Sequence, residues 1–404
     1  MTETANNIRR LNKCNVFEVI AHEGPISRAA IAKRLGLSKQ TLSEVAKELE
    51  SEGWVQQVGL ERGNVGRAAM NFEVVPDAAF VAAVDLGGTK VKVAIANLAC
   101  QIFGEATEKT DPKGGGAVVN QIARLCREMM DQHGLQQDRL RLAVVGVPGV
   151  PDHESGAVHM APNIPQLDEI DFAGELSKAL GFDVVIENDV NLAVLGEHWG
   201  GVAQHVDDLA YVALGTGIGA GIIVNGELVR GKNGGAGELG YLPFGADPFE
   251  DASLRQGALE RVTATDAMRD YYFELTGDKI EVPEIFDRLD QDDHAQKVLD
   301  RTARETARAV AAISALIDPE QIVFGGSIGR REELFSRIKA QFSLITRSPV
   351  ELYISDLGGK AALIGAASLG LSHVHATLLA GGVPGAEITL PPAKLAKLGV
   401  VSNG

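Results

Sequence analysis

Residues 81–98, VAAVDLGGTKVKVAIANL, place one glycine turn between two apolar runs and decide how the central part of the chain folds. The run 81–84 is typical of a short buried strand, and the alternating run 91–98 predicts a second strand. The segment 85–90 is therefore predicted to be the turn of a hairpin. A P-loop would need the pattern GxxxxGK[ST] leading into a helix, and this segment lacks it.

The turn between these strands is suited to a phosphate group. Two glycines let the backbone approach a ligand closely with its N–H groups directed at it, and a threonine adds a hydroxyl. An aspartate in the same turn can hold the magnesium ion that accompanies a nucleotide. The candidate nucleotide-binding residues here are Asp85, Gly87, Gly88, Thr89 and Lys90.

Two further glycine turns follow apolar strand patterns far downstream. The run 214–221 resembles a dinucleotide fingerprint, but residues 222–229 predict a strand, an Asn-Gly turn and another strand where a Rossmann site needs a helix. The run 325–329 ends another apolar strand, after the helical stretch 301–317. These turns add Gly215, Thr216, Gly217, Gly325 and Gly326 to the candidate nucleotide-binding residues. The alternative is that the fold alone needs these glycines.

Three glycine turns at strand ends, spread over two halves of one chain, predict a bilobal α/β nucleotide-binding fold. The arrangement resembles the actin/hexokinase-like superfamily. Residues 214–240 are similar to the signature of the ROK family (repressors, open reading frames and sugar kinases). The turn at 85–90 resembles that family's first phosphate motif, residues 147–163 its sugar-side loop, and residues 187–191 its catalytic stretch.

The resemblance implies roles for single residues. Asp189 matches the aspartate that acts as general base on a sugar hydroxyl during phosphoryl transfer from ATP. The other residues that match sugar-contacting positions are Asn163, Asn188, Glu238, Tyr241 and Glu260. In the alternative interpretation, which we favour, Asp189 accepts a hydrogen bond from a sugar effector and performs no chemistry. Binding of ATP with magnesium remains open.

The sequence departs from the family where relatives bind zinc. The family has a histidine at the position of Tyr241 and continues into a cysteine-rich motif, whereas residues 242–258 contain neither cysteine nor histidine. We therefore expect no zinc, because the usual ligands are missing. Packing of Phe244 and Phe249 is our hypothesis for what holds this loop instead.

The first 75 residues predict a winged helix-turn-helix. Helical patterns at 8–20, 28–35 and 39–51 precede two strands at 54–58 and 70–75. Ile8, Leu11, Val16, Phe17 and Ile20 form the apolar stripe of the first helix, while Ser27 and Ser38 cap the next two helices. The predicted DNA-binding residues are Ser38, Lys39, Gln40, Ser43 and Lys47 on the third helix, with Arg62 and Arg67 in the wing. The alternative is a protein-docking module.

Composition limits the remaining possibilities. The 404 residues carry a formal net charge of −16, which argues against general binding of nucleic acid or membranes. Residues 1–75 nevertheless hold 10 Lys and Arg against 9 Asp and Glu, while the remainder holds 28 against 45. Three cysteines without a CxxC pair argue against a disulfide framework. The polar N-terminus lacks a signal core, so a cytoplasmic location is expected.

The sequence as a whole predicts a sugar-responsive transcription regulator that binds double-stranded operator DNA as a homodimer or tetramer. The family resemblance implies that it represses a carbohydrate operon. The alternative is an ATP-dependent sugar kinase, so enzymatic activity stays undecided. The predicted domains are 1–75 for DNA binding, 76–371 for the bilobal part (lobes 76–200 and 201–371), and a C-terminal tail at 372–404. The pair His373 and His375 is interpreted as a solvated coincidence and not as a metal site.

Overall fold

The computed structural model describes residues 3–60, 70–152, 155–159, 161, 163–347, 350–381 and 388–395. Two compact units divide the chain, the first formed by Met1–Glu187 with Ala366–Gly404 and the second by Asn188–Gly365. The chain therefore passes into the second unit before helix α6 (Asp189–Gly200), ahead of the predicted lobe boundary at 200/201.

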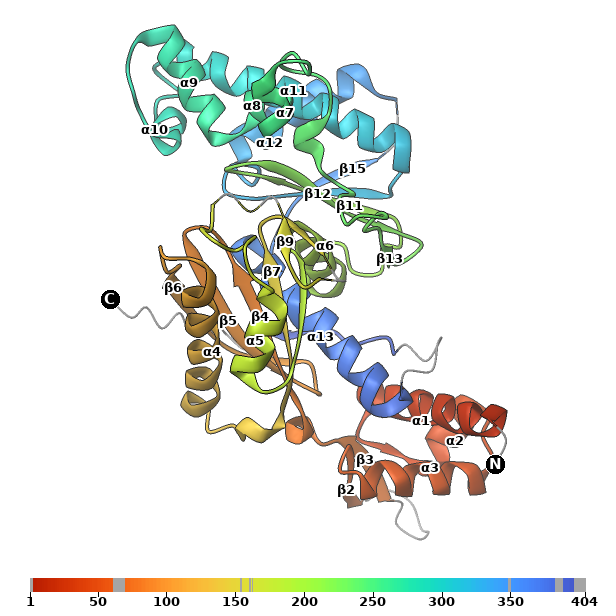
Figure 1. The fold of residues 1–404 in the computed structure, drawn as a ribbon. Coiled ribbons are helices and arrows are strands. Elements are labelled where there is room, and N and C mark those ends of the chain that lie inside the picture. Colours follow the sequence, from red (N-terminus) through yellow and green to blue (C-terminus); the bar gives the residue numbers. More distant parts are fainter. Residues whose placement is uncertain are drawn as a thin grey trace. The chain divides into compact units, whose positions relative to one another are not determined.

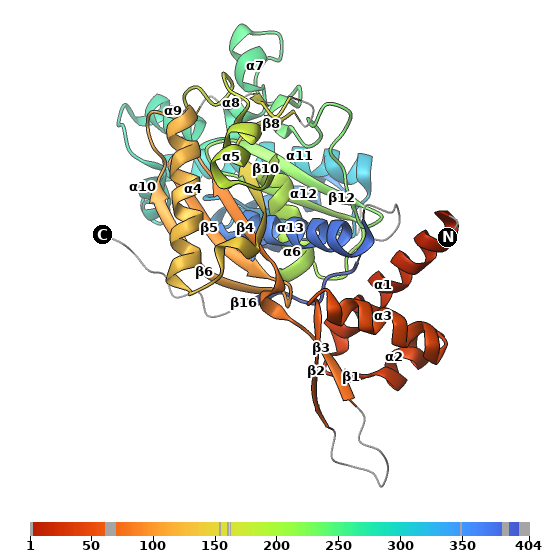
Figure 2. The same ribbon diagram turned by 60° about the horizontal axis from the view of Figure 1, so that its bottom comes forward.

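The N-terminal part of the first unit is a winged helix-turn-helix (Figure 2). Its elements are α1 (Glu3–Glu23), β1 (Ile26–Ser27), α2 (Arg28–Leu35), α3 (Lys39–Ser51), β2 (Val55–Leu60) and β3 (Met70–Val74), with sheet order β1-β3-β2. Val16, Phe17 and Ile20 of α1 are buried, as predicted. Ile8 is 55% exposed, so its place on the inner stripe was predicted wrongly. The wing turn at 61–69, with Arg62 and Arg67, lies outside the described residues.

Local capping explains the bounds of the two shorter helices. The Ser27 hydroxyl accepts a hydrogen bond from the Ala30 N–H at 3.3 Å, and Gly36 ends α2 in the left-handed conformation with φ of 65°. The Ser38 hydroxyl accepts from the Thr41 N–H at 3.0 Å and begins α3. Side chains that satisfy the free N–H groups of a first turn stabilise the helix there, so these predicted caps are confirmed.

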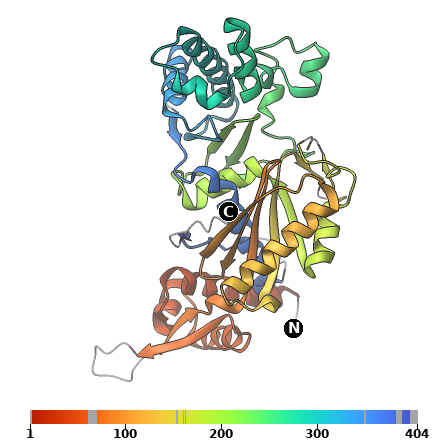
Figure 3. The same cartoon turned by 90° about the vertical axis from the view of Figure 1, so that its left-hand side faces the viewer.

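The rest of the first unit is built on a mixed sheet with the order β10-β7-β4-β5-β6-β16. Its elements are η1 (Pro76–Ala78), β4 (Phe80–Leu86), β5 (Lys90–Asn97), β6 (Gln101–Lys109), α4 (Gly115–Gln132), η2 (Gln137–Arg139), β7 (Leu140–Val147), β8 (Val150–Pro151), β9 (Val158–His159), α5 (Phe172–Leu180), β10 (Asp183–Asn188) and β16 (Lys394–Leu395). Helices α4 and α5 lie side by side, and Figure 3 shows α4 running along the sheet. Strands β4 and β5 pair antiparallel, which confirms the predicted hairpin.

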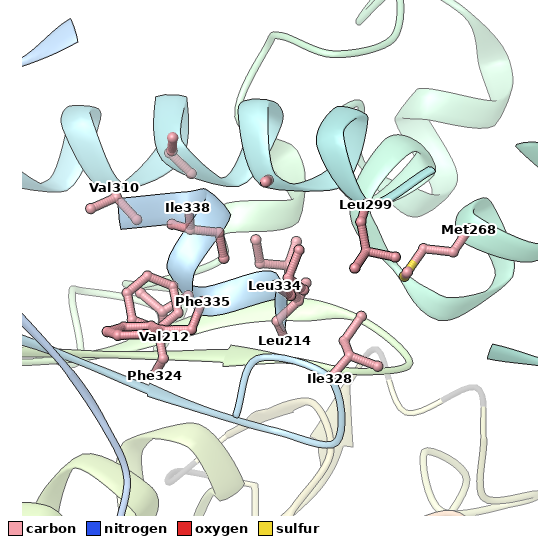
Figure 4. Close-up of a cluster of buried hydrophobic side chains, with 14 of the residues drawn as sticks. Val212, Leu214, Met268, Leu299, Val310, Phe324, Ile328, Leu334, Phe335 and Ile338 are labelled. Atoms are coloured by element: carbon pink, nitrogen blue, oxygen red, sulfur yellow. The ribbon is translucent and has the colours of Figure 1, made fainter. Parts of the chain in front are cut away.

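The second unit has a sheet with the order β13-β12-β11-β14-β15. Its elements are α6, β11 (Leu209–Leu214), β12 (Ile218–Val224), β13 (Glu227–Leu228), η3 (Leu239–Tyr241), α7 (Asp251–Gln256), α8 (Glu260–Thr263), α9 (Thr265–Thr276), α10 (Val282–Asp287), α11 (Asp293–Ile317), β14 (Gln321–Gly325), α12 (Glu332–Ile345), β15 (Glu351–Ile354) and η4 (Gly358–Lys360). Figure 4 shows Phe324 and Val212 of the sheet packed under Phe335 and Ile338 of α12.

The glycine run at 214–221 forms a β-hairpin, because β11 and β12 pair antiparallel from Leu209–Ile223 to Leu214–Ile218. No helix follows the run, which confirms the rejection of a dinucleotide site. The turn at Gly325 and Gly326 follows β14, which pairs in parallel with β11. Both turns therefore lie at strand ends, as predicted, and the structure adds that the strands β11 and β14 are neighbours.

Part of the predicted C-terminal tail forms regular structure in the described residues. Helix α13 (Ala361–Ala380) continues past residue 372, and Ile388 and Leu390 are buried beyond it. Lys394 and Leu395 then pair in parallel with β6. His375 on α13 is only 1% exposed and stacks edge-on against Phe17 of α1 at 5.1 Å, so its interpretation as a solvated residue was wrong.

Candidate functional site

The outer face of α3 carries the predicted DNA-binding residues. Ser38, Lys39, Gln40 and Lys47 are exposed, and Ser43 is half-buried. The opposite face buries Leu42, Val45, Ala46 and Leu49. A helix that buries one face and presents exposed polar side chains on the other has the form required to enter a DNA major groove.

Three acidic side chains at the C-terminal half of α3 have partners that sequence reasoning missed. Arg9 of α1 contacts the Glu48 carboxylate at 2.6 Å, and the nearly buried Lys13 pairs with Glu48 and Glu52. Glu50 accepts hydrogen bonds from the Gln57 amide at 2.8 and 2.9 Å. Because α1 supplies cations to α3, the acidic residues of this helix oppose DNA binding less than their number indicates.

The first glycine turn lies next to a predicted sugar-binding residue of the same unit. A Cβ atom added to Gly88 would stand 2.8 Å from Cβ of Asn163, so the glycine is what allows the two segments to approach. Asp85, the candidate magnesium ligand, is paired with Lys92, whose Nζ lies 2.8 Å from Oδ2. A cation therefore already neutralises this carboxylate.

In the second unit, the chain positions Asp189 at the first turn of α6. The Asn188 side-chain oxygen accepts hydrogen bonds from Val190 N–H at 2.9 Å and Asn191 N–H at 3.0 Å, which makes it the N-cap. The cap fixes the backbone that carries Asp189, whose own Oδ1 accepts a hydrogen bond from the Val190 N–H at 2.9 Å. Both side chains are half-buried. This local arrangement suits hydrogen bonding to a hydroxyl group.

Glu238, Tyr241 and Glu260 lie close enough to interact electrostatically in the same unit. Desolvation by the surrounding protein raises the pKa of the Glu238 carboxyl. Desolvation also raises the pKa of Glu260, aided by the charges of Glu238 and Asp266 and opposed by a hydrogen bond from the Ile218 N–H at 3.2 Å. Paired carboxylates in a poorly solvated place bind hydroxyl donors well.

One predicted nucleotide-binding glycine lies beside this cluster. A Cβ atom on Gly217 would stand 2.6 Å from Oε2 of Glu260. Any larger residue here would therefore clash with the carboxylate in its present position. At Gly325 a Cβ would instead stand 1.7 Å from the Tyr211 hydroxyl, and at Gly326 it would meet the Leu214 backbone. Packing within the chain therefore accounts for these glycines, and nucleotide binding stays a prediction.

The loop at 242–258 is held by hydrogen bonds and an ion pair. The Tyr241 hydroxyl donates to the Arg255 carbonyl at 3.1 Å, and the Arg261 guanidinium contacts Glu250 and the Ser253 hydroxyl, each at 2.7 Å. Phe249 is 90% exposed, so the hypothesis that it packs the loop was wrong. Phe244 does pack against the core and under Arg308.

The segment 242–258 contains neither cysteine nor histidine, the usual zinc ligands. In the described part of the chain, no group of three or more histidine, cysteine, aspartate or glutamate side chains is arranged to hold a metal. All three cysteines, Cys14, Cys100 and Cys126, are buried and free. Among the described helices, none is both long and apolar enough to cross a membrane.

The fold and these sites together define a class of protein: a DNA-binding winged helix joined to a bilobal α/β domain of the sugar-kinase type. The chain belongs to the ROK family, because the model of that family matches residues 81–372. Residues 11–64 match the MarR family, which agrees with the winged helix-turn-helix at the N-terminus.

Some similar proteins match nearly the whole chain, and others match about 70% of it. A glucokinase of Thermotoga maritima is 33% identical over 310 residues, which cover 71% of this chain and 95% of the glucokinase. A putative xylose repressor of Caldicellulosiruptor is 26% identical over 397 residues and covers 91% of this chain and 97% of its own. A crystal structure described as a ROK family transcriptional regulator, a homolog of the E. coli MLC protein, superposes with a TM-score of 0.77 over 92% of this chain and 98% of its own; at 23% identity it shows the fold alone.

Proposed function

We propose that the protein is a sugar-responsive repressor that binds operator DNA and controls a carbohydrate operon. The observation that carries the proposal is the match to a putative xylose repressor along 91% of the chain, because that match includes the winged helix as well as the ROK domain. The outer face of α3 supports it, since Lys39, Gln40 and Lys47 are exposed there and the helix begins at the Ser38 cap.

The operator side of the function rests on α3 and the wing. Ser38, Gln40 and Ser43 are the residues that we propose to reach base edges, and Lys39 and Lys47 bind phosphates or guanine. Arg62 and Arg67 of the wing are proposed to bind phosphates or the minor groove. A helix-turn-helix protein of this kind reads a palindrome as a homodimer, so we propose a dimeric or tetrameric assembly.

The effector side of the function rests on the hydrogen-bonding groups of the ROK domain. The residues that we propose to bind a sugar or sugar derivative are Asn163, Asn188, Asp189, Glu238, Tyr241 and Glu260. Glu238 and Glu260 are acceptors for sugar hydroxyls, while the amides offer both donors and acceptors. A sugar shifts operator binding only if it prefers one of two conformations of the protein, which is the behaviour we propose.

A sugar kinase is the second candidate, favoured by the 33% identity to a glucokinase. In this function Asp189 would take the proton of a sugar hydroxyl, at the capped start of α6. ATP with magnesium would be held by the turns at Asp85, Gly87, Gly88, Thr89, Lys90, Gly215, Thr216, Gly217, Gly325 and Gly326. The Asp85–Lys92 ion pair weighs against this candidate, because a magnesium ion would have to share an already paired carboxylate.

The regulator is tested by capturing sheared genomic DNA on the full-length protein and sequencing what is retained, with and without a panel of sugars. We expect a few palindromic sites beside a carbohydrate operon, and release of these sites by one sugar. The Lys39→Ala/Gln40→Ala variant is the control and should lose enrichment while it keeps its affinity for the sugar. Uniform recovery of DNA by the wild type would overturn the proposal.

The kinase is tested by coupled ADP release over the same sugar panel. Turnover that Asp189→Asn abolishes would support phosphoryl transfer. No turnover with any sugar, from protein that binds a sugar in calorimetry, would leave effector binding as the only use of this site. The two assays use the same preparation, so an inactive sample is recognised by its failure in both.

A further inference from the structure

The exposed face of α3 contains one acidic residue among its polar side chains. Gln40, Ser43, Glu44 and Lys47 are spaced by three or four residues, which places them on the same side of the helix. Glu44 is exposed, whereas Leu42 and Val45 on the other side are buried. A carboxylate on the face that approaches DNA needs an explanation, because phosphates repel it.

The other acidic side chains at this helix have partners that anchor them to the domain. Glu48 contacts Arg9 and Lys13, and Glu52, at the C-cap, contacts Lys13. Within the described residues, Glu44 has no ion pair, and its hydrogen bond comes from the Gln40 amide, 3.2 Å from Nε2 to Oε1. The described residues therefore hold this carboxylate in no ion pair on the outer face of α3.

The bond from Gln40 orients the carboxylate and leaves Oε2 of Glu44 able to accept another hydrogen bond. In the major groove the fitting donor is the N4 amino group of cytosine, which pairs with glutamate or aspartate in direct readout. The same charge weakens binding to DNA that offers no donor at this place, since its repulsion from phosphates is then not offset.

We propose that Glu44 is a specificity-determining residue that accepts a hydrogen bond from a cytosine in each operator half-site and disfavours other DNA. The inference rests on the proposed function, because it requires α3 to enter the major groove. It assigns to Glu44 an effect opposite to that of Lys39 and Lys47, which strengthen binding to any sequence.

The test is selection of binding sites from random double-stranded DNA by the full-length wild type and by Glu44→Ala and Glu44→Gln. Alanine is a good helix former at an exposed position, so α3 is expected to fold. We expect the wild-type half-site to contain one required cytosine and Glu44→Ala to accept any base there. Affinity for a single half-site should fall about 5- to 150-fold, the range for one lost base contact, and affinity for the palindrome should fall further because the contact is lost twice. Affinity for random DNA should rise in the same variant.

Glu23→Ala is the matched control, since it removes a negative charge from the same domain, where Glu23 pairs with Arg34. It should leave the base preference unchanged. If Glu44→Ala binds the operator and random DNA more tightly by the same factor, with the cytosine still required, Glu44 only repels phosphate and the inference is overturned. If the wild type enriches no sequence at all, the proposed function fails, and the inference fails with it.

Discussion

His375 makes the contact between α13 and the winged helix sensitive to acid. Its ring is 1% exposed, packs edge-on against Phe17, and neither ring nitrogen has a hydrogen-bond partner among the described residues. Desolvation by burial lowers the pKa of His375 from 6.5 to about 4. In the unfolded chain the imidazole takes up a proton below its ordinary pKa, whereas the folded protein resists protonation. Stability is therefore complete above about pH 6.5 and is lost as the pH falls toward about 4.

The magnitude follows from the difference between the two pKa values. Each tenfold change in proton affinity corresponds to about 1.4 kcal/mol, so full titration of His375 removes about 3 kcal/mol. Between about pH 7 and about pH 5.5 the loss amounts to about 1 kcal/mol. His375→Phe should abolish this part of the pH dependence, because phenylalanine keeps the contact with Phe17 and buries no ring nitrogen.

The assay is urea unfolding at these two pH values, followed by tryptophan fluorescence. The chain has two tryptophans, so a Trp199→Phe background leaves Trp54 of the winged helix as the reporter. His373→Phe, at an exposed position on the same helix, is the control and should keep the wild-type pH dependence. The reasoning is refuted if His375→Phe loses as much free energy of unfolding between the two pH values as the wild type.

Three further predictions concern the proposed sugar-binding cluster and the loop at 242–258. Gly217→Ala should weaken sugar binding about tenfold or more in calorimetry, because the new Cβ would stand 2.6 Å from Oε2 of Glu260. Unchanged affinity would show that this carboxylate does not bind the ligand. Sugar affinity should fall as the pH is lowered through the raised pKa values of Glu238 and Glu260, since ionised carboxylates accept hydroxyl hydrogen bonds; a flat profile of affinity against pH would contradict this. Arg261→Gln should make proteolysis of the loop at 242–258 faster, because it breaks the ion pair with Glu250. A metal chelator should change the proteolysis rate of neither the variant nor the wild type. A faster rate for the wild type with chelator would mean that a metal holds the loop.

Local signals account for what the sequence predicted well. The helices of the DNA-binding part begin and end where Ser27, Gly36 and Ser38 act on their own neighbours, so a short window of sequence contains the whole cause. The strand hairpins around the glycine turns are equally local. The residues expected at the ligand site were chosen for the hydrogen-bonding groups of their side chains. Their roles stay predictions until ligand binding is measured.

Contacts between distant segments account for what the sequence could not predict. Arg9 and Glu48 are 39 residues apart, and no spacing rule joins them. The same holds for His375 and Phe17. The HxH pattern alone led to the wrong prediction that His375 is solvated. Phe249 shows the reverse error, because an aromatic residue in a loop was expected to pack and is exposed. In each case the environment of the side chain is set by the tertiary fold.

Glycines show why an intact motif is weak evidence for a ligand. Gly217 and Gly325 both follow strand patterns and both suggest a phosphate turn, but an added Cβ would meet the Glu260 carboxylate in the first case and the buried Tyr211 in the second. The two substitutions should therefore behave differently. Gly325→Ala must displace a packed tyrosine ring and should lower the free energy of unfolding by about 1 to 3 kcal/mol in urea titrations. Gly217→Ala should leave stability nearly unchanged and affect sugar binding. If Gly325→Ala leaves stability intact and removes nucleotide binding instead, a ligand, and not packing, requires this glycine.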